Sequence, residues 1–211
     1  HDSKIDTFEA DVKPVQRFLM DNNILGSIEI KGEYESSEKI DHVYKNPEIK
    51  PSDFKPDLKV ISIDTESDKK GNLYCIGIYS NNYKKNFMIT NLNLNNTVSC
   101  KNEEECLEKF RSEVQKLDPD IITGWNLVSF DLVFLQQLFR KHKIQFDIGR
   151  TNDPVRLRIE SSFFRSSNAD VTGRQVLDAM SLIRDPFIQE APSIKHAEFD
   201  SYTLEDVSNA I

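Results

Sequence analysis

The sequence predicts an α/β domain from about Leu58 onward, in which a mixed β-sheet is flanked by helices. The first observation is the apolar run Val60–Ile63, which is followed directly by carboxylates. The second is the dense apolar run Leu73–Tyr79, which fits an antiparallel partner strand after a turn at 68–72. The third is the helical spacing of apolar residues over Asn102–Leu117.

The other elements of this domain follow from the same patterns. A third strand is expected around Asn86–Ile89, and Asn102 with Glu105 predicts the N-terminus of the long helix. A buried strand is expected over 120–126, followed by a helix near 130–142. The apolar stripe of the long helix is predicted to pack in the core, namely Cys106, Leu107, Phe110, Val114 and Leu117.

The C-terminal third of the sequence is less regular. Residues 147–174 are polar, with a hairpin expected across Phe163–Phe164. Arg174–Ile183 is predicted as a further strand that carries Asp178. Residues 201–211 begin a helix without a C-cap, which predicts a domain truncated at this end.

Residues 1–56 are predicted to form a partial N-terminal α+β domain and a linker, ahead of the second domain at 57–211. Three prolines in its second half favour an irregular connection. The expected order is a strand at Thr7–Val12, a helix at Pro14–Met20, a strand at Gly26–Tyr34 and a connecting segment over 35–57.

Composition restricts the class of protein. With 211 residues, 38% hydrophobic and 29% charged, the sequence is ordinary for a soluble globular chain. No apolar run approaches the roughly 18 residues of a membrane span, so no membrane partner is expected. The net charge of −8 argues against a general nucleic-acid coat but not against a nuclease. Three cysteines without a C-x-x-C pair favour reduced thiols over a zinc site: Cys75, Cys100 and Cys106.

Asp64 and Glu66 are the first candidate functional residues. Side chains two apart on a strand point to the same face, and two like charges held together favour a hard divalent cation between them. An Asp/Glu pair in a solvated turn is the alternative. A calcium loop is excluded, because its sixth position would be Lys69 instead of Gly and its twelfth Cys75 instead of Glu.

Asp131 is the second candidate, at the point where a strand end passes through a turn into a helix. Such a junction aims a carboxylate back at the edge of the sheet. Taken alone, Asp131 is more typical of a helix start, where the helix dipole favours negative charge.

These residues resemble the motifs of proofreading 3′–5′ exonucleases. Ile63–Glu66 matches their D-x-E first motif, and Asn126–Asp131 matches their N-x-x-x-F-D second motif. The resemblance covers about residues 7–150. Three flanking stretches are similar to the exonuclease region of family B DNA polymerases of the bacterial polymerase II type: Glu9–Pro14, Gly71–Ile78 and Asp118–Asn126.

The resemblance implies a ribonuclease H-like fold and removal of the 3′-terminal nucleotide from single-stranded DNA with two Mg²⁺ or Mn²⁺ ions. By the same resemblance, Asp64 bridges both ions, Glu66 binds the ion that activates water, and Asp131 serves the second ion. These three residues are therefore expected to be catalytic and metal-binding. Asn126 and Phe130 are expected to bind the substrate.

The resemblance also implies partners and a location. The partners are the 3′ end of single-stranded DNA and the polymerase domain of the same full-length chain. The expected location is the bacterial cytoplasm, at the nucleoid. Two other functions stay open: a DNA-binding module without catalysis, and a standalone nuclease of this fold that acts on RNA or repair intermediates.

A third motif of the family, Y-x-x-x-D, is matched literally by Tyr202–Asp206. Its flanks resemble a segment that precedes the third motif in polymerase II relatives, so we expect the true motif beyond Ile211 and little exonuclease activity from this chain alone. The separation of 75 residues from Asp131 (206 − 131) suits shorter exonucleases of the same fold, which keeps Asp206 open as a ligand.

Basic residues concentrate in the segment 140–174, which carries eight Lys/Arg against four Asp/Glu. Phosphate contacts together with base stacking on Phe163 or Phe164 would bind single-stranded DNA without sequence preference. A solvated surface explains the charge about as well. The arginines expected to contribute most are Arg156, Arg158 and Arg165.

Overall fold

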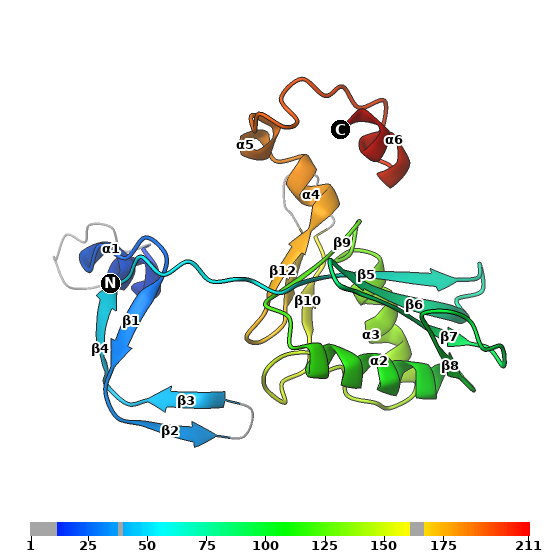
Figure 1. The fold of residues 1–211 in the computed structure, drawn as a ribbon, viewed down its shortest axis with the longest axis horizontal. Coiled ribbons are helices and arrows are strands. Elements are labelled where there is room, and N and C mark those ends of the chain that lie inside the picture. Colours follow the sequence, from blue (N-terminus) through cyan, green and yellow to red (C-terminus); the bar gives the residue numbers. More distant parts are fainter. Residues whose placement is uncertain (1–11, 38–39, 161–166) are drawn as a thin grey trace, which may run out of the picture. The chain divides into compact units, whose positions relative to one another are not determined.

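The computed structural model describes residues 12–37, 40–160 and 167–211, and the chain divides into two compact units, residues 1–57 and 58–211 (Figure 1). The first unit contains helix α1 (Pro14–Asp21) and four short strands: β1 (Ile28–Lys31), β2 (Tyr34–Ser37), β3 (Ile40–Tyr44) and β4 (Glu48–Pro51). Strand β1 pairs antiparallel with β4, and β2 pairs antiparallel with β3.

The prediction of a connecting segment over 35–57 is wrong, because most of β2 and all of β3 and β4 lie there. The prolines of this segment are the reason that the sequence predicts an irregular connection. Pro47 precedes β4 and Pro51 is the last residue of β4, and at a strand end the missing N–H costs little. The strand expected at 7–12 lies outside the described residues except for its last position.

The second unit is built on a six-stranded mixed sheet in the order β12–β9–β5–β6–β7–β8. Strand β6 runs antiparallel to β5 and to β7, while β9 runs parallel to both β5 and β12. Strand β8 is parallel to β7. The bounds are β5 (Val60–Ser67), β6 (Leu73–Ser80), β7 (Tyr83–Ile89), β8 (Thr97–Cys100), β9 (Ile121–Gly124) and β12 (Gln175–Asp178). The predicted mixed sheet flanked by helices is confirmed.

Two long helices, α2 (Glu103–Leu117) and α3 (Asp131–Lys141), contact each other and pack on the sheet (Figure 1). Helix α2 contacts β6, β7 and β8, and α3 contacts β5. The N-terminus of α2 forms as predicted, because the Asn102 side chain accepts a hydrogen bond from the Glu105 amide at 2.9 Å. The Glu105 carboxylate accepts from the Lys101 amide at 2.7 Å, one residue before the position of an ideal capping box.

The hydrophobic core lies between these helices and the sheet. Alternate residues of β5 point into it, and the helices contribute their apolar stripes. Twelve large side chains are essentially inaccessible to solvent: Phe87, Phe110, Phe139, Ile63, Ile76, Ile78, Leu107, Ile122, Leu127, Leu132, Leu135 and Ile148. This packing makes β5 a rigid support for the residues on its other face.

The segment after α3 differs in part from prediction. The hairpin expected there exists as β10 (Arg156–Arg158) and β11 (Asn168–Asp170), but its predicted tip at Phe163–Phe164 lies outside the described residues. The strand predicted over 174–183 ends at Asp178, because its side chain accepts from the Ser181 amide and so caps helix α4. The C-terminal helices are α4 (Ala179–Ile183), α5 (Pro186–Gln189) and α6 (Leu204–Ala210).

Across residues 12–37, 40–160 and 167–211, no helix is long and apolar enough to cross a membrane.

Candidate active site

Asp64 and Glu66 lie on one face of β5, and both side chains are exposed. Between and before them, Thr65 and Ile63 point to the opposite face and are buried. The predicted same-face arrangement of the two carboxylates follows from the regular strand. Because the core-facing side chains of β5 are packed, the strand holds in place the backbone that carries Asp64 and Glu66.

Asp131 is the first residue of α3 and is only 2% exposed. Its Oδ1 atom accepts two hydrogen bonds from Thr65, one from the backbone amide at 2.9 Å and one from the hydroxyl at 2.7 Å. Burial raises the pKa of Asp131 to about 6, and the nearby charge of Asp64 acts in the same direction, while the Thr65 hydrogen bonds oppose both. Burial and the charge of Asp64 therefore both disfavour the ionised form of this carboxyl.

The turn 125–130 connects β9 to α3 and contains two of the predicted substrate-binding residues. Asn126 adopts a left-handed backbone with φ of 54°, a conformation that Asn tolerates better than most residues. The Asn126 carbonyl accepts a hydrogen bond from the Phe130 amide at 3.0 Å. The Phe130 side chain is 54% exposed, which leaves its ring accessible to a ligand.

Gly124 ends β9 immediately before this turn, and only glycine fits there. A Cβ atom at this position would lie 2.5 Å from the Ile63 carbonyl oxygen and 3.2 Å from the Leu127 side chain. The close approach brings the turn against the middle of β5. It therefore determines where Asp131 meets Thr65.

The structure thus joins Asp131 to the strand of Asp64 and Glu66 through Thr65. It does not assemble a complete set of ligands: within the described parts of the chain, no group of three or more His, Cys, Asp or Glu side chains could hold a metal ion. Asp64 and Asp131 are close enough to interact electrostatically.

Asp206 is engaged locally in the N-terminal turn of α6. Its carboxylate accepts hydrogen bonds from the Ser201 and Thr203 hydroxyls, and these bonds lower the pKa of Asp206. Tyr202 contacts the second-motif turn by its backbone, since its carbonyl accepts from Trp125 Nε1 at 3.3 Å. The Arg184 guanidinium lies over the Tyr202 ring, 4.5 Å from its centroid. None of these contacts of Tyr202 and Asp206 involves Asp64 or Glu66 on β5.

Three residues that contact this site were not predicted to lie there from the sequence: Thr65, Cys75 and Asp178. Thr65 occupies the variable position of the D-x-E motif, where the alternation of the strand was the available signal. Cys75 is the cross-strand partner of Glu66, and burial together with the charges of Glu66 and Asp64 raises the pKa of its thiol to about 11. Asp178 binds the turn 125–130 from β12 by accepting from the Val128 amide.

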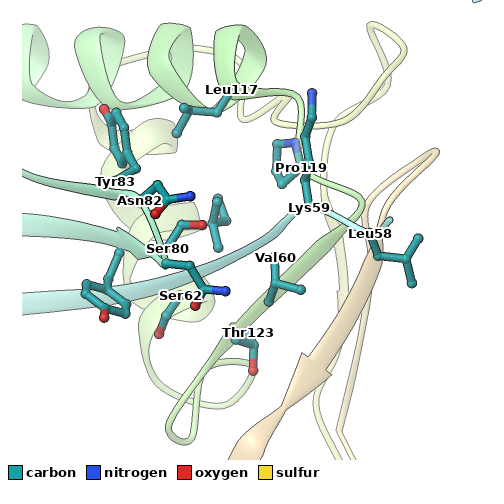
Figure 2. Close-up of a pocket in the computed structure, with 13 residues that line it drawn as sticks. Leu58, Lys59, Val60, Ser62, Ser80, Asn82, Tyr83, Leu117, Pro119 and Thr123 are labelled. Atoms are coloured by element: carbon teal, nitrogen blue, oxygen red, sulfur yellow. The ribbon is translucent and has the colours of Figure 1, made fainter. Parts of the chain in front are cut away.

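A pocket of about 470 Å³ lies at the other end of β5, where the strand begins (Figure 2). Figure 2 shows Leu117 and Pro119 on one side of it, and Val60, Ser62 and Thr123 on the other. None of its lining residues carries a carboxylate. This pocket is therefore no candidate for a divalent metal site.

Comparison with known proteins identifies the family to which this chain belongs. The family model for the exonuclease domain of DNA polymerase family B matches residues 5–207. DNA polymerase II of Escherichia coli (strain K12) is 29% identical over 217 residues, covering 98% of this chain and 26% of that protein. The DNA polymerase delta catalytic subunit of Dictyostelium discoideum is 33% identical over 118 residues, covering 51% of this chain and 10% of its own length.

A solved structure shows the same fold. The family B DNA polymerase from the hyperthermophilic archaeon Pyrobaculum calidifontis matches with a TM-score of 0.66 at 17% identity, over 97% of this chain and 25% of that one. The chain therefore spans about a quarter of the length of the Escherichia coli and Pyrobaculum calidifontis polymerases. Since the family model covers nearly the whole sequence, this chain belongs to the family of exonuclease domains of family B DNA polymerases.

Proposed function

We propose that this chain is a 3′–5′ proofreading exonuclease domain that removes the terminal nucleotide from single-stranded DNA. The observation that carries the proposal is the junction of β5 with α3. Asp131 is buried directly behind the strand that presents Asp64 and Glu66, and Thr65 joins the two elements by two hydrogen bonds. Membership of the exonuclease domain family supports the same reaction.

The residue types at this junction are those that Mg²⁺ or Mn²⁺ prefers. All three predicted ligands are carboxylates, which hard divalent cations prefer. Burial is the main cause that raises the pKa of Asp131 to about 6, and the charge of Asp64 adds to it, so a nearby cation would lower the cost of ionising this carboxyl. Two bound ions would activate a water molecule and stabilise the leaving oxygen.

The chain's own residues have separate roles in this proposal. Asp64 and Glu66 would help to hold the ion that activates water, and Asp64 and Asp131 would help to hold the ion that stabilises the leaving oxygen. Asp131 also aligns α3 with β5 through Thr65, so its position is determined before any ion binds. The hydrogen bonds of Asp206 within its own turn argue against this residue as the remaining ligand.

The substrate is the 3′ end of single-stranded DNA. Asn126 and the exposed ring of Phe130 lie in the turn that leads to Asp131, where they would hold the terminal nucleotide. The basic hairpin β10–β11 would contact the phosphates farther along the strand. The polymerase domain of the same full-length chain would deliver the mispaired end.

A single assay tests the reaction. A single-stranded oligonucleotide labelled at its 5′ end should shorten one nucleotide at a time with Mn²⁺ or Mg²⁺ in the full-length protein. Asp64→Ala and Glu66→Ala should abolish shortening, whereas Glu108→Ala, an exposed carboxylate on α2, should leave the rate unchanged. Persistent shortening in both β5 variants would refute the proposed roles of these carboxylates.

A second candidate, DNA binding without cleavage, is favoured by one observation. The described residues contain no group of three ligands that could hold a metal ion. Under this alternative, the protein retains an end-labelled single-stranded oligonucleotide in a filter-binding assay. The length of the oligonucleotide stays constant in the presence of Mn²⁺. The oligonucleotide assay therefore separates the two candidates directly.

A further inference from the structure

Asp178 is a buried carboxylate that neither the sequence motifs nor the proposed reaction uses. It is the last residue of β12, where it lies opposite Gly124 in the parallel pair with β9, and it is 8% exposed. Its Oδ2 atom accepts a hydrogen bond from the Val128 amide at 3.0 Å. Its Oδ1 atom accepts from the Ser181 amide at 3.1 Å.

Capping helix α4 explains only half of this arrangement. An N-cap needs one side-chain oxygen, and Ser or Thr would serve as well as Asp. The second oxygen reaches a backbone amide 50 residues earlier in the chain, in the middle of the turn 125–130. Two backbone amides, those of Val128 and Ser181, therefore donate to this nearly buried carboxylate.

A carboxylate is required for this pair of bonds. An amide at the same place would offer one oxygen and one NH₂ group, and the NH₂ would face an N–H donor. A serine hydroxyl could still cap α4, but it is too short to reach Val128 as well. The site therefore distinguishes Asp from residues that serve equally well as ordinary caps.

The Val128 amide is a critical point of attachment for the proposed active site. The turn that contains it begins after Gly124, presents Asn126 and leads directly into Asp131. At its far end, Asp131 is bonded to Thr65 in β5. Two buried carboxylates thus hold one connection: Asp178 binds the middle of the turn, and Asp131 binds β5 where the turn passes into α3.

We propose that Asp178 is a positioning residue of the exonuclease site: through Val128 it fixes the turn that contains Asn126 and leads into Asp131, which is bonded to Thr65 next to Asp64. This inference rests on the proposed function. Without the Asp178 bond, the turn keeps its attachment at Asp131 but gains freedom at Val128. The rate of hydrolysis should then fall more than the affinity for DNA, because metal-assisted hydrolysis depends on the exact positions of the ligands.

The test compares Asp178→Ser and Asp178→Asn with Asp185→Ser in the full-length protein. Asp185 is the matched control because it caps helix α5 through the Phe187 and Ile188 amides and makes no hydrogen bond to the turn 125–130. For Asp178→Ser we expect kcat on single-stranded DNA to fall at least about tenfold, with KM within about twofold. The Mn²⁺ concentration for half-maximal activity should rise, and Asp185→Ser should match the wild type in all three values.

A spectroscopic measurement supplies a readout independent of activity. Trp125, the one tryptophan of the 211-residue sequence, stands at the start of this turn. Its emission in metal-free buffer should shift in the Asp178 variants of this chain and stay unchanged in Asp185→Ser. If Asp178→Ser does not fold, Asp178→Asn decides, since it preserves the volume of the side chain.

The outcomes are distinguishable. A kcat within twofold of wild type together with unchanged Trp125 emission in folded Asp178 variants would overturn the positioning role. A wild-type protein without exonuclease activity would overturn the proposed function instead. The attachment of the turn by Asp178 would then be decided by the fluorescence alone.

Discussion

Thr65 and Asp131 are joined by two hydrogen bonds that end on the same atom, since the amide and the hydroxyl of Thr65 both donate to Asp131 Oδ1. The two residues are 66 positions apart in sequence and lie on different elements, β5 and α3. The variable residue of the D-x-E motif is therefore the one that connects the first carboxylates to the second motif.

Thr65→Val should lower exonuclease activity without unfolding the protein. Valine keeps the shape and the backbone amide of threonine but removes one hydrogen bond to a charged group, for which we expect a loss of about ten- to a hundredfold in kcat. Thr65→Ser retains the hydroxyl and should keep most of the activity. Equal activities of the Val and Ser variants in steady-state assays would show that the hydroxyl has no part in positioning Asp131.

Asp131→Asn should abolish exonuclease activity and at the same time stabilise the metal-free fold. The amide oxygen can still accept both Thr65 bonds, while the charge that burial opposes is removed. The pKa of Asp131 is raised to about 6 in the folded protein, whereas an Asp in the unfolded chain has a pKa of about 3.9. The ionised carboxyl therefore destabilises the fold increasingly as pH rises from about 4 to 6. The gain should be on the order of 2 kcal/mol above pH 7 and vanish near pH 4. Urea unfolding in EDTA at several pH values measures it, and a destabilised variant at pH 8 would contradict the account.

Asp206→Asn should leave exonuclease activity unchanged and lower the melting temperature. The carboxylate accepts from Ser201 and Thr203 at the start of α6, so its removal weakens that helix terminus. Parallel nuclease assays and thermal melts of the full-length protein check both effects. Loss of activity on this substitution would instead make Tyr202 and Asp206 the third motif of the exonuclease.

The hairpin β10–β11 should contribute to binding of single-stranded DNA. Arg156 and Arg158 are exposed on β10, and their double replacement by Glu should weaken binding at low salt. Losing two phosphate contacts should also reduce the slope of log K against log salt by about 1.4. Fluorescence anisotropy in EDTA measures both quantities. Replacing exposed Lys101 and Lys116 by Glu makes the same change in net charge on another surface and is the control; equal effects in both variants would assign binding to overall charge.

Asp118→Asn should lower stability at neutral pH but not in acid. Arg150 and Arg174 each donate to Asp118 Oδ1 at 2.8 Å, and the Arg150 bond above all holds the pKa of Asp118 below its usual range. A lowered pKa stabilises the fold above about pH 4, and this contribution disappears as pH falls through the native pKa. The difference in melting temperature between wild type and variant should therefore close below pH 4. Asn tolerates the left-handed backbone of Asp118, so strain does not confuse the comparison.

Local patterns in the sequence predicted most of the second unit. Strands β5 and β6, helices α2 and α3 and the cap at Asn102 follow from periodicity and short-range hydrogen bonding. Strand alternation also placed Asp64 and Glu66 on one face. The first unit was predicted less well, because strands of four or five residues beside prolines carry little pattern. The end of β12 was missed because a single capping bond at Asp178 decides it.

By itself, the sequence determined most elements of the second unit, the two motifs and the family to which they belong, because each rests on neighbours within a few positions. Only the tertiary structure decided which groups meet. Thr65 meets Asp131, and Asp178 meets Val128, across separations of 66 and 50 residues. Gly124 permits the close packing against Ile63 that brings these partners within reach. Such contacts depend on sheet order and on the crossing of helix over strand, which no local pattern of residues encodes.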